Sequence, residues 1–276
     1  MSERNYYIPA EILEMVSNVG VDKAKRKYIK QLMLAFMAGA FIAFAAEAST
    51  MASFNYILNA DTYGTARLII GLMFGAGLML VTLAGGELFT GNTLMVISLM
   101  DKKIKIYEML INWCLVWVGN LIGSLLIAFM MQSTGLYYSG DGHLGEAVVK
   151  IAYNKVTLSF HAAFISGVLC NWLVCGAIWL SYAAKDVSGK VLGVFFVIFL
   201  FATSGFEHSI ANMYYIPAGI LAKPNYMYLK DYTQVAYDAL NWGSFFLRNL
   251  LPVTLGNIVG GAFFIGIIYR FIYKVK

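Results

Sequence analysis

The chain has 276 residues and a net charge of +5, with 60% hydrophobic and only 13% charged residues. Soluble globular domains carry roughly 25% charged residues, so this composition and a mean hydropathy of +0.69 exclude an ordinary soluble protein. Apolar stretches of about 20 residues, the length that crosses a bilayer, recur along the whole chain. We therefore expect one all-α integral membrane domain over residues 1–276.

The first 29 residues are polar and amphipathic. They lack the short apolar core and the small-residue cleavage site of a secretory signal, so we expect this cytoplasmic segment to stay in the mature protein. Its part at 6–28 fits two roles, a passive helix at the membrane interface or a segment that covers and uncovers a pore. The sequence alone leaves both roles open.

Six apolar segments are bounded by charged and turn residues: 30–54, 66–100, 107–133, 158–183, 191–218 and 244–272. An even number of transmembrane helices places both termini on one side of the membrane. Of the 20 Lys and Arg residues, 14 then lie on the side of the termini, which the positive-inside rule identifies as the cytoplasm. We expect a multi-pass protein of the cell membrane with cytoplasmic termini, and a tyrosine-rich outer loop at 219–243 that lies near the interface.

Three motifs of the first half of the chain recur, in the same order, in the second half. They are AFMAG (35–39) and AFISG (163–167), GGELFTGN (85–92) and GFEHSIAN (205–212), and NWCLVWVGNLIG (112–123) and NLLPVTLGNIVG (249–260). Small residues recur in membrane helices because they let neighbours pack closely, but that does not explain matched acidic and amide residues. Since each half has three spans, the second half enters the membrane upside down. We predict two inverted repeats of three helices each, residues 30–133 and 134–276.

The second and fifth spans are both interrupted, at 85–92 and at 205–212. Backbone that leaves helical geometry inside a bilayer must be covered by protein or line a cavity, and paired interruptions in two repeats point to a transport path. The second interruption contains Glu207 and His208 side by side. Ionisable groups at this depth are costly and generally face a cavity, and a histidine can exchange its proton near neutral pH.

The motifs GGELFTGN (85–92), CNWLVC (170–175) and SGFEHSIANM (204–213) closely resemble the signatures of the formate/nitrite transporter family. The resemblance extends over all six spans. It implies a homopentamer in which each protomer has its own pore and an aquaporin-like arrangement of helices. The partners to expect are membrane lipids and small anions, with no nucleic acid, no metal and no cofactor.

The resemblance also implies which residues line the pathway. Six polar residues match family positions along it: Thr90, Lys155, Asn171, Glu207, His208 and Asn212. Thr90 belongs to the interrupted-helix loop together with Leu88 and Phe89, and Lys155 is the vestibule lysine that Asn171 faces. Four apolar residues match the constrictions, Phe74 and Leu78 on the inner side and Leu88 and Phe201 on the outer side.

A small anion in such a pore has to lose water and cross apolar constrictions, where an isolated charge costs several kcal/mol or more. We expect Lys155 to concentrate anions at the outer vestibule, and polar residues between the constrictions to replace lost water. We expect His208 to lend a proton, so that formate crosses wholly or partly as the neutral acid. Glu207 is expected to hold backbone or a neighbouring helix in place.

Formate is the expected substrate, and nitrite and hydrosulfide are the alternatives within the family. A neutral-solute channel of aquaporin type also fits the broken helices, although paired Asn-Pro-Ala loops are lacking. An intramembrane enzyme is disfavoured because the three histidines show no HExxH spacing and the three cysteines lie in apolar runs, where they suit packing. Glu47 also lies within an apolar run, and the sequence does not decide its role.

Overall fold

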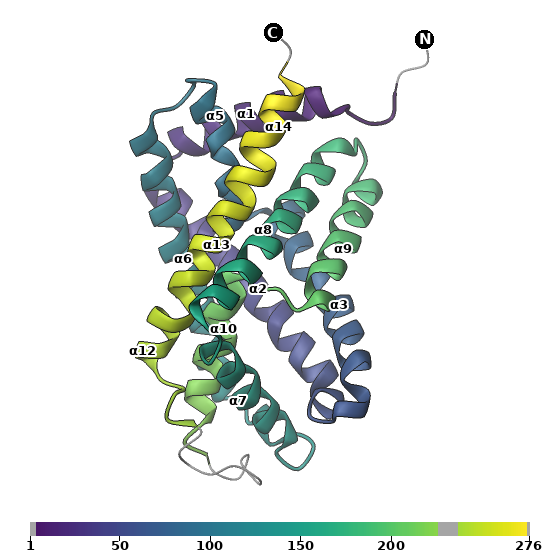
Figure 1. Cartoon of the computed structure of the whole chain (residues 1–276), viewed down its shortest axis with the longest axis vertical. Helices are drawn as coiled ribbons and strands as arrows, with labels where there is room; N and C mark the ends of the chain where they lie inside the picture. The colour runs from purple at the N-terminus through teal and green to yellow at the C-terminus, as the bar shows by residue number, and fades with distance from the viewer. Residues whose placement is uncertain (1–3, 226–236, 275–276) are drawn as a thin grey trace.

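The computed structural model describes residues 4–225 and 237–274; the middle of the predicted outer loop 219–243 lies outside these ranges. Within the described residues, six helices are long and apolar enough to cross a membrane, in agreement with the six predicted segments. They are Tyr28–Ile57, Ala60–Gly85, Ile106–Gln132, Phe160–Ala183, Val187–Ser204 and Trp242–Tyr273. The first and last helices, α1 (Pro9–Lys25) and α14 (Ile268–Tyr273), lie at the same end of the bundle (Figure 1). We call this end the terminal side and the opposite end the far side.

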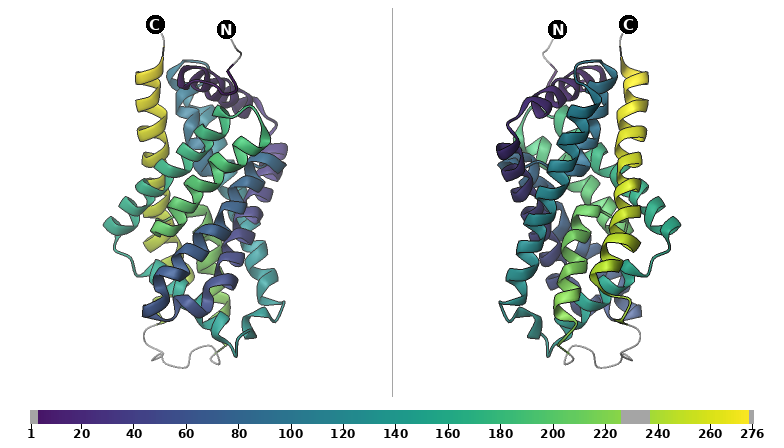
Figure 2. Two further views of the ribbon diagram at one scale, coloured as in Figure 1. Left: turned by 90° about the vertical axis from the view of Figure 1, so that its right-hand side faces the viewer. Right: turned by 90° about the vertical axis from the view of Figure 1, so that its left-hand side faces the viewer.

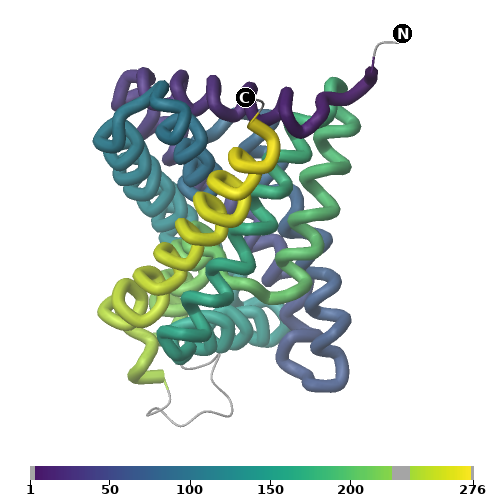
Figure 3. Tube along the Cα trace, turned by 45° about the horizontal axis from the view of Figure 1, so that its top comes forward, coloured from purple at the N-terminus to yellow at the C-terminus, as the bar shows by residue number. Residues whose placement is uncertain are grey.

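Helix α1 lies across the terminal end of the bundle (Figures 1 and 3). Proline occupies its first turn, and the Glu11 carboxylate accepts a hydrogen bond from the Ile8 backbone N–H at 2.8 Å, so its start is well capped. Its buried face includes Ile12, Leu13 and Val16. At Gly20 an added Cβ would lie 2.0 Å from Ser98 Oγ, so only glycine allows this close seat on the bundle.

The first half of the chain forms three spans. The second span leaves helical geometry after Gly85, which has φ +99°, a conformation that glycine adopts without strain. Its elements are α2 (Tyr28–Ile57), η1 (Ala60–Thr62), α3 (Tyr63–Met79), the π-helical turn η2 (Leu80–Gly85), α4 (Phe89–Asn92), η3 (Thr93–Met95), α5 (Val96–Met100) and α6 (Ile106–Gln132). The break therefore lies where the sequence predicted it.

The second half repeats this plan, and its fifth span breaks after Gly205, with φ +81°. Its described elements are η4 (Leu136–Tyr138), α7 (His143–Val156), α8 (Phe160–Ala183), α9 (Val187–Ser204), α10 (Ser209–Ala222), α12 (Trp242–Ser244), η6 (Phe245–Leu250), α13 (Leu251–Ile258), η7 (Val259–Ile267) and α14. The last span runs along one edge of the bundle (Figure 2). Helix α7 lies at the far end, opposite α1 (Figures 1 and 3).

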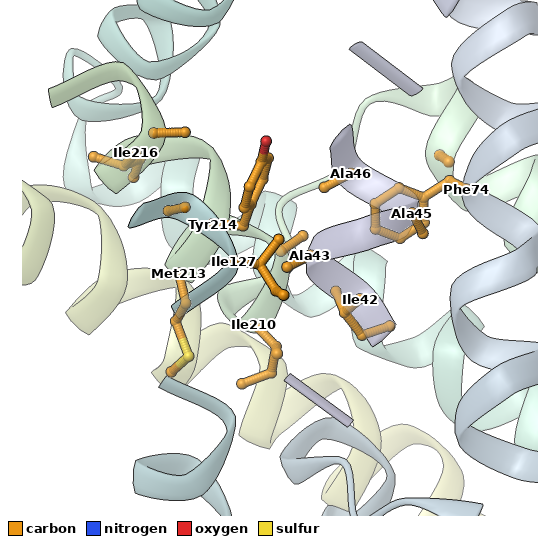
Figure 4. Packing of buried hydrophobic residues seen from close by; sticks show 14 of the residues in the cluster. Ile42, Ala43, Ala45, Ala46, Phe74, Ile127, Ile210, Met213, Tyr214 and Ile216 are labelled. Atoms are coloured by element: carbon orange, nitrogen blue, oxygen red, sulfur yellow. The ribbon is translucent and has the colours of Figure 1, made fainter. Parts of the chain in front are cut away.

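Within each half, small residues bring two helices into backbone contact, and the two contacts are at equivalent places in the repeat. A Cβ at Gly39 of α2 would lie 2.1 Å from the Asn120 carbonyl oxygen of α6, and a Cβ at Gly256 of α13 would lie 2.1 Å from the Phe164 carbonyl oxygen of α8. The centre of the core is filled where α2 meets α10, with alanines of α2 facing Ile210 and Tyr214 (Figure 4). Close packing of this kind is how helices associate in membranes, and it fixes the two breaks relative to each other.

Asp101, in the loop before α6, ties the terminal side together. Its carboxylate accepts hydrogen bonds from Ser17 of α1 at 2.7 Å, from Arg270 of α14 at 2.9 Å, and from Lys274. Burial raises the pKa of this carboxyl, but the hydrogen bonds outweigh that effect, so its pKa lies below the usual value. The loop, the first helix and the last helix are thus joined by one carboxylate.

Candidate functional site

The two breaks meet in the interior of the protein. Thr90, in α4 after the first break, is fully buried, and His208, which precedes α10 after the second break, is 3% exposed. The distance from Thr90 Oγ1 to His208 Nε2 is 3.0 Å. The structure therefore brings together two polar side chains that lie 118 positions apart in sequence and that the sequence analysis placed on the same pathway.

The hydrogen bonds of His208 define its protonation state. The Ala211 backbone N–H donates to His208 Nδ1 at 3.1 Å and so caps the start of α10. An acceptor nitrogen carries no proton, so the neutral ring has its proton on Nε2. His208 therefore donates this N–H to the Thr90 hydroxyl oxygen, and the ring can become positively charged only by losing the bond to Ala211.

The backbone carbonyl of Thr90 is held by a second group of residues. The Thr90 carbonyl oxygen accepts hydrogen bonds from the Thr93 hydroxyl at 2.7 Å, the Asn171 amide at 3.2 Å and the Cys175 thiol at 3.4 Å. Asn171 also donates to the Asn257 carbonyl at 2.6 Å. Asn171 is predicted to face Lys155, whereas in the structure the Asn171 amide contacts the Thr90 loop.

Two cavities approach the Thr90–His208 pair from opposite sides. The far-side cavity has a volume of about 800 Å³ and is lined by Lys155, Glu207, His208 and Asn212 among others. The terminal-side cavity has a volume of about 290 Å³ and is lined by α1 and the first break. Among the described residues, the two cavities share no lining residue.

The four apolar residues predicted to form constrictions are buried and line the two cavities, but they pair differently from the prediction. The rings of Phe74 and Phe201 pack edge to face with their centroids 5.6 Å apart, and both residues line the far-side cavity. Leu78 and Leu88 line the terminal-side cavity. The expected pairing of Phe74 with Leu78 on the inner side, and of Leu88 with Phe201 on the outer side, was therefore wrong, because residues one helical turn apart on α3 face different cavities.

Glu207 is the centre of a buried hydrogen-bond cluster. Its carboxylate accepts from the Lys155 ammonium at 2.7 Å, from the Asn212 amide at 2.7 Å and from the Asn249 amide at 3.2 Å. Asn249 also donates to the Lys155 backbone carbonyl at 2.9 Å. Glu207 thus joins α7, α10 and the last span, and it neutralises the lysine expected to attract anions.

Glu87 has the same surroundings on the terminal side. Its carboxylate accepts from Lys23 at 2.8 Å, from Asn92 at 2.8 Å and from Arg26, and Asn112 donates to the Lys23 carbonyl at 3.3 Å. The two breaks are held in the same way, by Asn120 on Phe89 N–H and by Asn257 on Ser209 N–H, each at 2.9 Å. These matched contacts are the inverted repeat in atomic detail.

The mirrored contacts extend the repeat further than the sequence indicated. Lys23 of α1 corresponds to Lys155 of α7, so α1 takes the position in the first half that α7 takes in the second. The predicted first repeat began only at residue 30. The separation of these lysines, 132 positions, falls within the range of 120 to 137 positions that separates the three pairs of repeated motifs, and this was the signal available in the sequence.

Glu47, whose role the sequence left open, is buried in α2 and accepts a hydrogen bond from the Tyr214 hydroxyl of α10. It does not line either cavity. Arg67 of α3, which the sequence analysis passed over, does line the far-side cavity. An arginine within an apolar span is itself a functional signal.

Comparison with known proteins identifies what this arrangement resembles. A family model described as "Formate/nitrite transporter" matches residues 10–271. A probable formate transporter of Methanothermobacter thermautotrophicus is 38% identical over 96% of each chain, and the formate channel FocA of Haemophilus influenzae is 34% identical over 96% of this chain and 94% of that one. A solved structure entitled "Pentameric formate channel with formate bound" superimposes with a TM-score of 0.80 at 36% identity, covering 89% of this chain and 97% of that one.

Proposed function

Because this chain belongs to the formate/nitrite transporter family, we propose that it is a channel for small monovalent anions of weak acids, formate first among them. The observation that carries the proposal is the buried Thr90–His208 pair, in which His208 lines the far-side cavity and Thr90 directly precedes Gly91, which lines the terminal-side cavity. A hydroxyl and an imidazole N–H are hydrogen-bond donors that suit a carboxylate stripped of water. The relatives described as formate channels support formate over nitrite and hydrosulfide.

His208 assists passage by protonating the anion. In the resting site Nδ1 is an acceptor and Nε2 carries the proton. When an anion reaches the ring, its negative charge favours uptake at Nδ1 of a proton from solvent on the side of the far-side cavity, and the bond from Ala211 opens. The Nε2 proton then passes to an anion oxygen, which leaves a neutral imidazole with its proton on Nδ1 and a neutral acid. The neutral acid crosses Leu78 and Leu88 without the cost of an isolated charge.

The substrate test is flux into liposomes that contain the purified protein, with formate, nitrite and hydrosulfide supplied separately and in competition. Formate entry well above that of protein-free liposomes, and faster at acidic pH, is the expected result. Rapid entry of a competitor without formate entry would reassign the substrate within the family. Entry of a neutral polyol instead of any anion would contradict the proposal.

The proton step is tested with His208→Asn. An asparagine oxygen can replace Nδ1 as the acceptor for the Ala211 N–H, because asparagine is a strongly preferred N-cap residue, but an amide does not transfer protons. We expect this variant to pass formate more slowly than wild type and without accompanying proton uptake, measured with a pH dye inside the liposomes. His208→Phe, which also removes the cap, is the comparison that separates loss of structure from loss of the proton. Unchanged proton uptake in His208→Asn would refute the step.

The assembly is proposed to be a homopentamer in the cell membrane with both termini in the cytoplasm. A pentameric structural relative supports the assembly, and the excess of Lys and Arg on the terminal side supports the orientation. Native mass spectrometry of the detergent-solubilised protein should give five chains. Cysteines introduced near Lys103 should react with an impermeant thiol reagent only from the cytoplasmic side.

A further inference from the structure

Three cations of the described residues line the far-side cavity: Arg67, Lys150 and Lys155. Lys155 is the lysine predicted to attract anions, but its charge is compensated, because its ammonium lies 2.7 Å from the Glu207 carboxylate. Three donors already bind the Glu207 carboxylate, with Lys155 at Oε1 and two asparagine amides at Oε2. The positive charge offered to an anion in this cavity therefore comes from another residue.

Arg67 carries an uncompensated charge in a fixed position. Among residues 4–225 and 237–274, no carboxylate lies within 4.0 Å of its guanidinium. Its Nε–H donates to the Thr203 carbonyl at 3.0 Å, and Nη2 donates to the Ala202 carbonyl. These carbonyls belong to the last turn of α9, where backbone acceptors lack partners within the helix. Since a helix end carries only about half an elementary negative charge, about half of the arginine charge remains.

The location of the guanidinium is set by the second break. At Gly205 an added Cβ would lie 2.9 Å from Arg67 Nη2, so glycine leaves the space in which the guanidinium rests. Ala202 directly follows Phe201, whose ring meets Phe74 in the constriction. Arg67 thus stands beside the entrance to the constriction, whereas no contact of the Lys150 ammonium is found among the described residues.

The chemistry of the free edge defines the ligand. The Nε–H and one Nη2–H of Arg67 donate to the carbonyls of Thr203 and Ala202. The two N–H groups of Nη1 and the second N–H of Nη2 are therefore available to a ligand. This pair forms a fork that matches two oxygens of one planar anion. We propose that Arg67 is an anion-binding residue at the far-side entrance of the constriction, and that it favours small planar anions with two oxygens, such as formate and nitrite, over hydrosulfide. The inference rests on the proposed function and names the residue that gives it anion preference.

The test compares wild type with Arg67→Gln, Arg67→Lys and Lys150→Gln in liposome flux assays, with the half-saturating concentration and the maximal rate determined for formate, nitrite and hydrosulfide. Arg67→Gln should raise the half-saturating concentration of formate and nitrite by about tenfold, the size expected for a hydrogen bond to a charged group, and that of hydrosulfide by much less. Lys150→Gln removes the same charge from the same cavity without touching α9, and should change all three by less than about twofold.

A purely structural role for Arg67 predicts a different pattern. Loss of the α9 cap alone would lower thermal stability and maximal rate but leave the ratio of formate to hydrosulfide half-saturation unchanged, and this result would overturn the proposal. Should Arg67→Gln fail to assemble, Arg67→Lys decides, because it keeps the charge and loses the fork; an unchanged formate-to-hydrosulfide ratio would refute the inference. Absence of anion flux in the wild type would overturn the proposed function and this inference together.

Discussion

Gly261, in the last span, should be intolerant of even one added methyl group. A Cβ added at this position would lie 2.1 Å from Thr93 Oγ1, 2.5 Å from Asn171 Nδ2 and 2.7 Å from Cys175 Sγ. These are the three donors that hold the Thr90 carbonyl. Gly261→Ala therefore perturbs the Thr90–His208 site without changing any residue of that site.

The size of the effect follows from the contacts. Thr93 Oγ1 would have to retreat by about 1.3 Å to reach an ordinary contact of 3.4 Å. Its bond to the Thr90 carbonyl is 2.7 Å long, and a shift of that size breaks it unless the loop follows. All three donors are fully buried, so none has open space to enter. Overpacking of this kind costs about 1–3 kcal/mol.

The assay has two parts, thermal stability of the solubilised oligomer and formate flux in liposomes. We expect Gly261→Ala to lower both, and the flux to fall even at temperatures where the oligomer is intact. Gly176→Ala is the matched control, because Gly176 follows Cys175 in α8 and an added Cβ there would meet nothing within 4 Å. Wild-type flux and stability in Gly261→Ala would show that the three donors do not determine the position of Thr90.

Two further predictions concern charged residues. Lys155→Met should destabilise the protein by about 3–5 kcal/mol, because it leaves the buried Glu207 carboxylate without its cation, and adding Glu207→Gln should restore part of that loss; equal melting temperatures of the single and double variants would contradict this. The pKa of Asp101 is lowered, because burial, which raises this pKa, is outweighed by hydrogen bonds from Lys274 and the other neighbours of the carboxylate. The contribution of Asp101 to stability is therefore complete above the usual pKa of 3.8 and is lost as the pH falls through the lower pKa of the folded state. In thermal melts over pH, wild type should exceed Asp101→Asn at neutral pH and approach it only below about pH 4.

The breaks in the second and fifth spans could be predicted from the sequence because their signals are local. Two glycines with positive φ, Gly85 and Gly205, end long apolar runs, and Glu87 and Glu207 follow each of them by two positions. A charge in an apolar span is costly enough to mark a site by itself. Depth, connectivity and the inverted order then follow from counting spans.

The direction in which a side chain faces could not be predicted in the same way. Phe74 and Leu78 lie on one face of α3, yet Phe74 packs against the ring of Phe201 and lines the far-side cavity. Leu78 lines the terminal-side cavity together with residues of the first break. Asn171 likewise lies on a uniformly apolar helix, where periodicity does not select a buried face. Such contacts depend on the packing of segments more than 80 positions apart.

The two carboxylate clusters are equivalent in geometry but not in charge. Glu87 faces two cations, Lys23 and Arg26, whereas Glu207 faces one, Lys155. On the far side the second cation, Arg67, is instead held by the end of α9, and it forms no ion pair with a carboxylate of residues 4–225 or 237–274. The far-side cavity therefore has a cation held by backbone carbonyls beside the Phe74–Phe201 contact, while Lys23 and Arg26 of the terminal-side cavity are both bound to Glu87. An inverted repeat with identical halves would present the same charges to both cavities, so the placement of Arg67 is where the two halves of the fold depart from that symmetry.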